Sequence, residues 1–435
     1  MAEHADLLAR HRRVMPDWLA LFYDQPIELV EGEGRHVIDG EGNRYLDFFG
    51  GILTTMTGYA VPEVIEAIQE QAAKMIHTST LYLIRPMIEL AEEISQLSGI
   101  PDAKVFFATS GSEANEAALL LASTVRKSNQ VLALRNSYHG RSFATMGITG
   151  NRGWSASSLS PFNVSYVHNG YRFRSPFRAY DDAAFIQACA DDLRDIITTT
   201  TAGDVATMIA EPIQGVGGFT IPPDGFFAAM KEVLDEFGIL FISDEVQTGW
   251  GRTGEHFWGY QAHGIVPDML TFAKGLGNGL SIAGVVAPAS MMDSVQANSI
   301  STFGGTPLVT AGALANLRYS LAHDLQGNAL VVGRRLMDQL TPLVEKFGVV
   351  GEVRGKGLMI GIELVGSDGR TPNPAAATRA IEHARTAGLL IGKGGLYGNC
   401  IRLAPPLSLT AEEADEGAGI LQEVLATVDR EEGAS

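Results

Sequence analysis

Between about residues 100 and 290, the chain alternates short, continuous apolar runs with segments of helical periodicity. Because these runs are continuous, each is expected to be a strand that is buried on both faces. Such strands occur in mostly parallel sheets that are sandwiched by helices, so the alternation predicts an α/β fold. The expected strands are Lys104–Ala108, Val131–Arg135, Ala206–Ala210, Ile239–Ser243, Met269–Ala273 and Ala283–Ala287, and the first helix of the series is Glu113–Arg126.

The C-terminal part of the chain has a different pattern. A helical stretch around Ala311–Leu340 is followed by Val349–Glu363, where the glycine spacing is typical of a hairpin. Leu389–Gly392 and Cys400–Ala404 are expected to be short strands, and Ala411–Val428 a closing helix. This mixture predicts a smaller α+β domain.

With 435 residues, 46% of them hydrophobic, the chain is long enough to bury more than one core. We expect a large ligand-binding domain over residues 61–320 and a small domain over residues 321–435. Residues 1–60 include short strands with turns around Gly34–Asn43, and we expect this segment to pack with the small domain.

Charge and cysteine content argue against several classes of protein. The 32 basic and 50 acidic residues give a net charge of −18, which argues against a nucleic-acid or anionic-membrane partner. Cys189 and Cys400 are the only cysteines, and their spacing fits neither a disulfide framework nor a zinc site. No apolar run reaches the roughly 18 residues that span a bilayer, and Met1–Arg13 lacks the apolar core of a secretory signal. We therefore expect a cytoplasmic protein without a metal site.

Two charged residues stand at the carboxyl ends of expected strands, where ligands of parallel sheets bind. Asp244 follows the apolar run that ends at Ser243, and Lys274 follows Ala273 and opens a glycine-rich turn. An amine placed there can form a Schiff base with pyridoxal phosphate, and a carboxylate can keep the pyridine nitrogen protonated. The alternative interpretation is a surface lysine and an N-capping aspartate.

The stretch Thr109–Glu116 follows the first expected strand and opens a helix. Gly111 permits close approach of a ligand to the backbone, and the unpaired N–H groups of a helix start favour an anion such as phosphate. The alternative is a capping box between Ser110 and Glu113, which needs no ligand.

Three further residues are candidates for binding. Tyr138 follows a strand and could stack on a flat heteroaromatic ring, or simply pack on the surface. Glu211 places a carboxylate at the end of the strand Ala206–Ala210. Arg402 lies within a strand, and a buried arginine needs an anion, either a substrate carboxylate or a structural salt-bridge partner.

In this order, these stretches resemble the class-III (ω-amino acid type) aminotransferases of the fold-type-I pyridoxal-phosphate enzymes. The resemblance runs from about Ile38 to the closing helix, and its most specific parts are Asp244–Gly254 and Ala273–Gly279. It implies a large domain that binds pyridoxal 5′-phosphate, a smaller α+β domain, and amino transfer by a ping-pong mechanism.

The resemblance also implies roles for single residues. Lys274 resembles the Schiff-base lysine, which also moves a proton between the substrate α-carbon and the cofactor, and Asp244 resembles the partner of the pyridinium nitrogen. The other cofactor contacts that it implies are Val246 below the ring, Tyr138 above it, Gln247 at the ring hydroxyl, and Gly111 and Ser112 at the phosphate. Thr302 resembles a threonine that reaches the phosphate of a neighbouring subunit, which implies a homodimer and leaves a tetramer open. Arg402 resembles the arginine that binds the substrate carboxylate.

Val216 departs from the family pattern. Members that use 2-oxoglutarate usually have a glutamate at this position, which neutralises the arginine while an ω-amine is bound. Valine cannot do so, and Arg402 is expected to stay available to a carboxylate in both half-reactions. This favours small acceptors such as pyruvate or glyoxylate.

Other stretches resemble the alanine–glyoxylate and 3-aminoisobutyrate–pyruvate branch, namely His77–Thr80, Val353–Glu363 and Phe303–Gly305. Tyr59 and Thr306 depart from that branch, because the family usually has histidine and asparagine at these positions.

Two positions concern the substrate pocket. Ile52 occupies a position that is often tyrosine in ornithine-specific relatives, and Tyr82 is expected either to face the substrate or to serve packing. They leave the amino donor undetermined.

The sequence thus predicts a transaminase that moves an amino group between a β- or ω-amino acid, or alanine, and a small 2-oxo acid. Alternatives within the same fold are an ω-aminotransferase that uses 2-oxoglutarate and a racemase or aminomutase. A nucleotide-binding oxidoreductase is disfavoured because no G-x-G-x-x-G opens a first helix and no Walker A sequence is present. A non-catalytic binding protein is disfavoured because a buried lysine without a ligand is costly.

Overall fold

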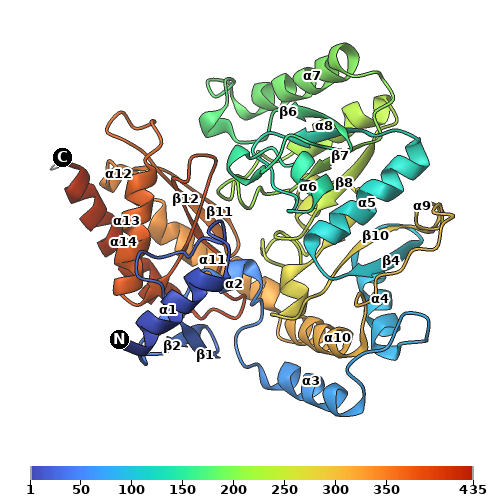
Figure 1. Cartoon of the computed structure of the whole chain (residues 1–435). Helices are drawn as coiled ribbons and strands as arrows, with labels where there is room; N and C mark the ends of the chain where they lie inside the picture. The colour runs from blue at the N-terminus through green and yellow to red at the C-terminus, as the bar shows by residue number, and fades with distance from the viewer. Residues whose placement is uncertain (1, 434–435) are drawn as a thin grey trace.

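The computed structural model describes residues 2–433, with side chains from Asp6 onward, and has a larger and a smaller region side by side (Figure 1). Strand β13 (Leu389–Leu390) pairs in parallel with β3 (Arg44–Asp47), which joins the N-terminal segment to the C-terminal part of the chain. The boundaries at residues 60 and 320 stay predictions, and Met1, Ala434 and Ser435, which fall in the predicted domains, lie outside the described residues.

The larger region is built on a seven-stranded sheet of order β4-β10-β9-β8-β7-β5-β6. The pairs from β9 to β6 are parallel, and β10 runs antiparallel to both of its neighbours, so the mostly parallel α/β sheet is confirmed. The strands are β4 (Ala103–Ala108), β10 (Ala283–Pro288), β9 (Met269–Phe272), β8 (Leu240–Asp244), β7 (Thr207–Ala210), β5 (Gln130–Leu134) and β6 (Asn163–Val167).

Strand β6 was not predicted from the sequence. It lies at the edge of the sheet, and only Val167 of its five residues is fully buried. Polar residues such as Asn163 and Ser165 interrupt the apolar run that marks the central strands.

Helices cover both faces of this sheet (Figure 1). One apolar cluster joins two of them to β5, β7 and β8, and another cluster joins the helix after β4 to the opposite face. The helices of this region are α3 (Pro62–Lys74), α4 (Arg85–Leu97), α5 (Gly111–Arg126), α6 (Phe143–Gly147), α7 (Asp182–Thr200), α8 (Phe226–Glu236), α9 (Ala289–Met292) and α10 (Pro307–Ala322). Short 3-10 turns lie at Arg152–Trp154, Arg172–Arg174, Gly259–His263 and Lys274–Gly277.

The smaller region contains two four-stranded sheets, of order β1-β2-β3-β13 and β11-β12-β15-β14. The predicted hairpin at Val349–Glu363 is the antiparallel pair β11 (Val350–Lys356) and β12 (Met359–Leu364). The remaining strands are β1 (Leu29–Glu33), β2 (His36–Asp39), β14 (Gly392–Gly394) and β15 (Cys400–Leu403), and the helices are α1 (Ala2–Val14), α2 (Gly50–Leu53), α11 (Leu325–Leu340), α12 (Leu343–Lys346), α13 (Pro374–Thr386) and α14 (Ala411–Gly433).

The helical stretch expected around Ala311–Leu340 is two helices, α10 and α11, which break at His323 and Asp324. Asp324 has a left-handed backbone (φ 46°), and its side chain accepts a hydrogen bond from the Gly327 N–H. An aspartate that caps a following helix in this way explains the break.

Candidate active site

A cavity of about 260 Å³ lies at the carboxyl ends of the central strands, where the sequence placed the chemistry. The pairing of Asp244 with Thr271 across β8 and β9 brings the two strand ends together. Eight of the predicted residues line this cavity: Gly111, Ser112, Tyr138, Glu211, Asp244, Val246, Gln247 and Lys274.

Lys274 follows β9 directly and has a left-handed backbone (φ 45°). Residues other than glycine in this conformation are uncommon and cluster at functional sites. Burial lowers the pKa of Lys274 to about 8, although Asp244 and Glu211 oppose the shift. At pH 7, roughly a tenth of this amine is then unprotonated and nucleophilic, far more than for an ordinary lysine.

Asp244 ends β8 and is buried. Its Oδ2 atom lies 2.8 Å from Nδ2 of Asn115 and 2.8 Å from Nδ1 of His139, and its Oδ1 accepts a hydrogen bond from the Val246 N–H (3.2 Å). Thr271 donates to Oδ1 of Asn115 (2.6 Å), which turns the Asn115 amino group toward Asp244. The carboxylate is thus held in one orientation at the cavity wall.

Asn115 and His139 were not predicted from the sequence as members of this site. Asn115 lies one helical turn after Gly111, on the same face of α5, and this spacing is a signal that could have identified it. His139 directly follows Tyr138, but its contact with Asp244 spans 105 residues and has no local signature.

The N-terminus of α5 opens onto the cavity, since Ser110, Gly111 and Ser112 all line it. A Cβ atom on Gly111 would lie 3.2 Å from Val246, and one on Gly140 would overlap with Oγ of Ser112. Both glycines therefore permit a close approach of backbone at this end. A helix N-terminus in this setting suits a phosphate group.

The capping box between Ser110 and Glu113, the alternative for this segment, is only partly formed. Oγ of Ser110 accepts from the Glu113 N–H (3.3 Å), but the Glu113 carboxylate accepts from Thr109 and Ser301. The helix is capped without the reciprocal bond of a capping box, and the cap leaves the cavity open for an anion.

Glu211 is buried and ties two cavity loops together. Its carboxylate accepts from the N–H groups of Tyr138 (2.9 Å) and Gly215 (2.8 Å), and burial raises its pKa to about 7.

Gln247 also lines the cavity, and its buried Oε1 has no hydrogen-bond partner among the described residues. A buried amide oxygen of this kind fits a hydroxyl group on a ligand.

Arg402, on β15, does not line the cavity, but it is near enough for its charge to lower the pKa of Lys274. Its Nη1 donates to the carbonyl of Gly215 (3.1 Å) and its Nε to that of Lys393 (3.2 Å). Its side chain is 5% exposed, and burial lowers its pKa to about 10. No carboxylate among the described residues forms a salt bridge with it, so the structural salt-bridge alternative is not seen.

Val216 is buried beside this arginine. A Cβ atom on Gly394 would lie 2.8 Å from Nε of Arg402 and 3.1 Å from the Val216 carbonyl, so the three residues are immediate neighbours.

Three other predicted residues lie outside the cavity. Ile52 and Tyr82 are 47% and 68% exposed, Thr302 is exposed, and none of these three lines the cavity.

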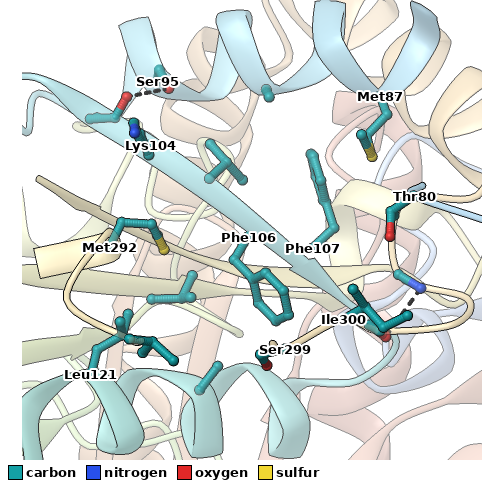
Figure 2. Close-up of a pocket in the computed structure, with 18 of the residues that line it drawn as sticks. Thr80, Met87, Ser95, Lys104, Phe106, Phe107, Leu121, Met292, Ser299 and Ile300 are labelled. Carbon is teal, nitrogen blue, oxygen red and sulfur yellow. Dashed lines mark hydrogen bonds between the residues drawn. The ribbon is translucent and has the colours of Figure 1, made fainter. Parts of the chain in front are cut away.

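A second, larger hollow of about 840 Å³ lies between α4, β4 and α5. Figure 2 shows Met87 of α4 and Leu121 of α5 on opposite sides, with Phe106 and Phe107 of β4 between them. Its lining is mostly apolar, and its one lysine, Lys104, is exposed and forms a salt bridge with Asp293. The smaller cavity, with its lysine and its buried aspartate, is therefore the candidate active site.

Within the part of the chain that the structure describes, no group of His, Cys, Asp and Glu side chains could hold a metal ion. Over residues 2–433, no helix is both long enough and apolar enough to cross a membrane.

Comparison with known proteins gives a consistent picture. The family model of class-III aminotransferases matches residues 22–425. An alanine–glyoxylate aminotransferase 2 homologue from Arabidopsis thaliana, described as mitochondrial, is 38% identical over 94% of this chain and 85% of its own length. An alanine/serine racemase from Pyrococcus horikoshii is 33% identical over 97% of this chain and 90% of its own.

The fold of a solved amine transaminase from an uncultivated Pseudomonas species, in its pyridoxal-phosphate-bound form, superposes with a TM-score of 0.87. That chain is 33% identical, and the match covers 93% of this chain and 96% of the other. The acid, the lysine, the helix N-terminus and the unpaired amide oxygen of the cavity fit the same cofactor. The chain therefore belongs to the class-III aminotransferases, enzymes of the fold-type-I α/β architecture that depend on pyridoxal phosphate.

Proposed function

We propose that this enzyme moves an amino group between a β- or ω-amino acid, or alanine, and a small 2-oxo acid such as pyruvate or glyoxylate, by a ping-pong mechanism. The observation that carries the proposal is Arg402, a buried guanidinium with no acidic partner among the described residues. A substrate carboxylate would supply the missing negative charge with bidentate geometry.

The residues of the cavity would hold the cofactor in one orientation. Pyridoxal phosphate, when bound, supplies an aldehyde that accepts the amino group and a ring that withdraws electrons. Lys274 would bind the aldehyde through Nζ, and Asp244 would hold the proton on the ring nitrogen. The remaining contacts would be Val246 and Tyr138 on the two faces of the ring, Gln247 at its hydroxyl, and Gly111 and Ser112 at the phosphate.

Lys274 would also move the proton at the substrate α-carbon. A pKa of about 8 suits this role, because a group that both takes and gives a proton works best when its pKa is near the working pH. Glu211, with a pKa near 7, lies close enough to influence both Lys274 and Arg402.

The choice of acceptor would follow from Val216. A valine next to Arg402 offers no carboxylate, so the arginine would stay free for the substrate in both half-reactions. Small 2-oxo acids need only this one carboxylate contact. Ile52 and Tyr82 would then border the space for the amino donor from outside the cofactor cavity.

We further propose that the enzyme is a homodimer in which Thr302 reaches the cofactor phosphate of the partner. Apolar side chains are exposed around the second hollow, including Leu81, Leu83 (92% exposed), Ile300 and Phe303. Large exposed apolar surfaces of this kind mark interaction sites. The exposed Thr302 lies within this surface, where a partner could receive it.

A racemase is the second candidate, because a relative that matches nearly the whole chain is an alanine/serine racemase. The two activities differ in their need for an acceptor. A racemase inverts its substrate without any 2-oxo acid, whereas an aminotransferase turns over only when one is present. We place the enzyme in the cytoplasm on the basis of its sequence.

A panel of amino donors, each tested with pyruvate, glyoxylate and 2-oxoglutarate, tests the proposal. We expect turnover with pyruvate or glyoxylate that exceeds turnover with 2-oxoglutarate. Preference for 2-oxoglutarate, or inversion of alanine without any acceptor, would contradict it.

A further inference from the structure

The guanidinium of Arg402 is held between two aromatic rings. Its central carbon lies 5.2 Å from the centre of the Phe49 ring and 5.4 Å from that of Phe219. Together with the two carbonyl contacts, these rings set the direction in which the unpaired cation points. The orientation of Arg402 therefore depends on where the Phe49 ring lies.

Phe49 directly precedes a strained turn. Gly50, Gly51, Ile52 and Leu53 have φ values of 53°, 57°, 67° and 61°, which make one turn of left-handed backbone. This conformation costs roughly 1–2 kcal/mol for each residue with a side chain, and a β-branched residue such as Ile52 is especially unfavourable there. Such a backbone persists only when its surroundings hold it in place.

The carboxylate of Asp47 holds the start of this turn. Its Oδ1 accepts from the N–H groups of Phe49 (2.8 Å) and Gly50 (3.0 Å), and its Oδ2 accepts from the hydroxyl of Tyr59 (2.6 Å). Asp47 is 3% exposed, and no cation of the described chain forms an ion pair with it. Burial raises the pKa of Asp47, and the hydrogen bonds from these three donors oppose the shift. Each donor therefore stabilises the charged form of the carboxylate.

Tyr59 is itself fixed. Its backbone N–H and carbonyl pair with Gly34 (2.7 and 3.0 Å), and a Cβ atom on Gly32 would lie 2.6 Å from its ring. The tyrosine hydroxyl therefore reaches Asp47 from a position fixed against the turn of the β1–β2 hairpin. This gives a physical role to a residue that departs from the histidine usual in the family.

We propose that Asp47 and Tyr59 are positioning residues for the substrate carboxylate. They hold the left-handed turn at residues 50–53 and, through Phe49, keep the guanidinium of Arg402 aligned with its ligand. The inference rests on the proposed function in one respect, that Arg402 receives the carboxylate.

The chain offers a matched control. The hydroxyl of Tyr45 donates to Oδ2 of Asp39 (2.8 Å) in the same small sheet, and Asp39 holds the turn at Glu41 and Asn43 rather than the turn after Phe49. Tyr45→Phe and Tyr59→Phe each remove one hydroxyl from a tyrosine–aspartate pair. A purely structural role predicts similar effects for the two variants.

The test titrates the holoenzyme with propionate, which has a carboxylate but no amino or oxo group, and follows binding by calorimetry. We expect the Kd of Tyr59→Phe to rise about fivefold to tenfold, because a guanidinium that is no longer held in one orientation must be ordered when the carboxylate binds. Tyr45→Phe should stay within about twofold of wild type. Asp47→Asn, which keeps the shape of the side chain, should raise Kd at least as much as Tyr59→Phe.

Turnover provides a second readout. In Tyr59→Phe, the KM for pyruvate should rise by the same factor as the Kd for propionate, while kcat changes less than about twofold. Equal Kd values in Tyr59→Phe and Tyr45→Phe would overturn the inference, as would wild-type enzyme that does not bind propionate. Wild-type enzyme that binds propionate but transfers no amino group would contradict the proposed function alone.

Discussion

The two polar centres of the molecule are built in opposite ways. Lys274, Asp244 and Glu211 meet in one cavity at the ends of β9, β8 and β7, and each acid counteracts the effect of burial on the lysine. Arg402 comes from a different sheet and is buried among rings and carbonyls, and no acid of the described residues forms an ion pair with it. In the first centre, acids of the protein itself offset the positive charge of the lysine. In the second, the positive charge of Arg402 needs a negatively charged ligand as its partner. This division suits an enzyme that keeps its cofactor and exchanges its substrates.

The largest expected effect is at the first centre. Lys274→Ala removes the amine that would bind the cofactor and move the proton, so turnover should fall by at least about a thousandfold. The protein should remain folded, because the lysine side chain reaches into a cavity. Turnover, circular dichroism and size-exclusion chromatography measure these outcomes, and robust catalysis by the variant would refute the assignment.

Asp244→Asn tests the role of the carboxylate in the same centre. The variant should still bind the cofactor but lose about two to three orders of magnitude in kcat, because a neutral amide no longer keeps the ring nitrogen protonated. Asn115 and His139 would then face an amide in place of a carboxylate. A rate near that of wild type would show that the acid has no such role.

Val216→Glu tests the second centre by supplying the acid that it lacks. The new carboxylate should pair with Arg402 and raise the KM for pyruvate and alanine on the order of tenfold. Val216→Gln is the control, since it has a similar size and no charge. If both variants behaved alike, the loss would come from crowding rather than from capture of the arginine.

The smallest expected effect is in pH dependence. The amine of Lys274 must be unprotonated to bind an aldehyde, and its pKa is lowered to about 8. The rate at which apoenzyme takes up pyridoxal phosphate should therefore rise with pH up to about 8 and then level off. An ordinary lysine would give a rate that still rises toward about pH 10. Stopped-flow absorbance distinguishes the two profiles.

The difference between the two centres also explains how much the sequence could predict. Asp244 and Lys274 follow continuous apolar runs, so local pattern and the strand-end rule were enough to place them in one site. Strand β6 escaped prediction because its edge position leaves polar residues exposed.

The surroundings of Arg402 could not be predicted in the same way. Phe49 and Phe219 reach it from positions far away in the sequence, and the left-handed turn that Asp47 and Tyr59 hold has no repeating pattern. Such contacts depend on distances between elements, which periodicity does not encode.

The most direct test of the central claim is reduction of the holoenzyme with sodium borohydride, followed by peptide mapping with mass spectrometry. We expect the reduced cofactor to be attached to the peptide that contains Lys274. A modification on another lysine, or none at all, would contradict it.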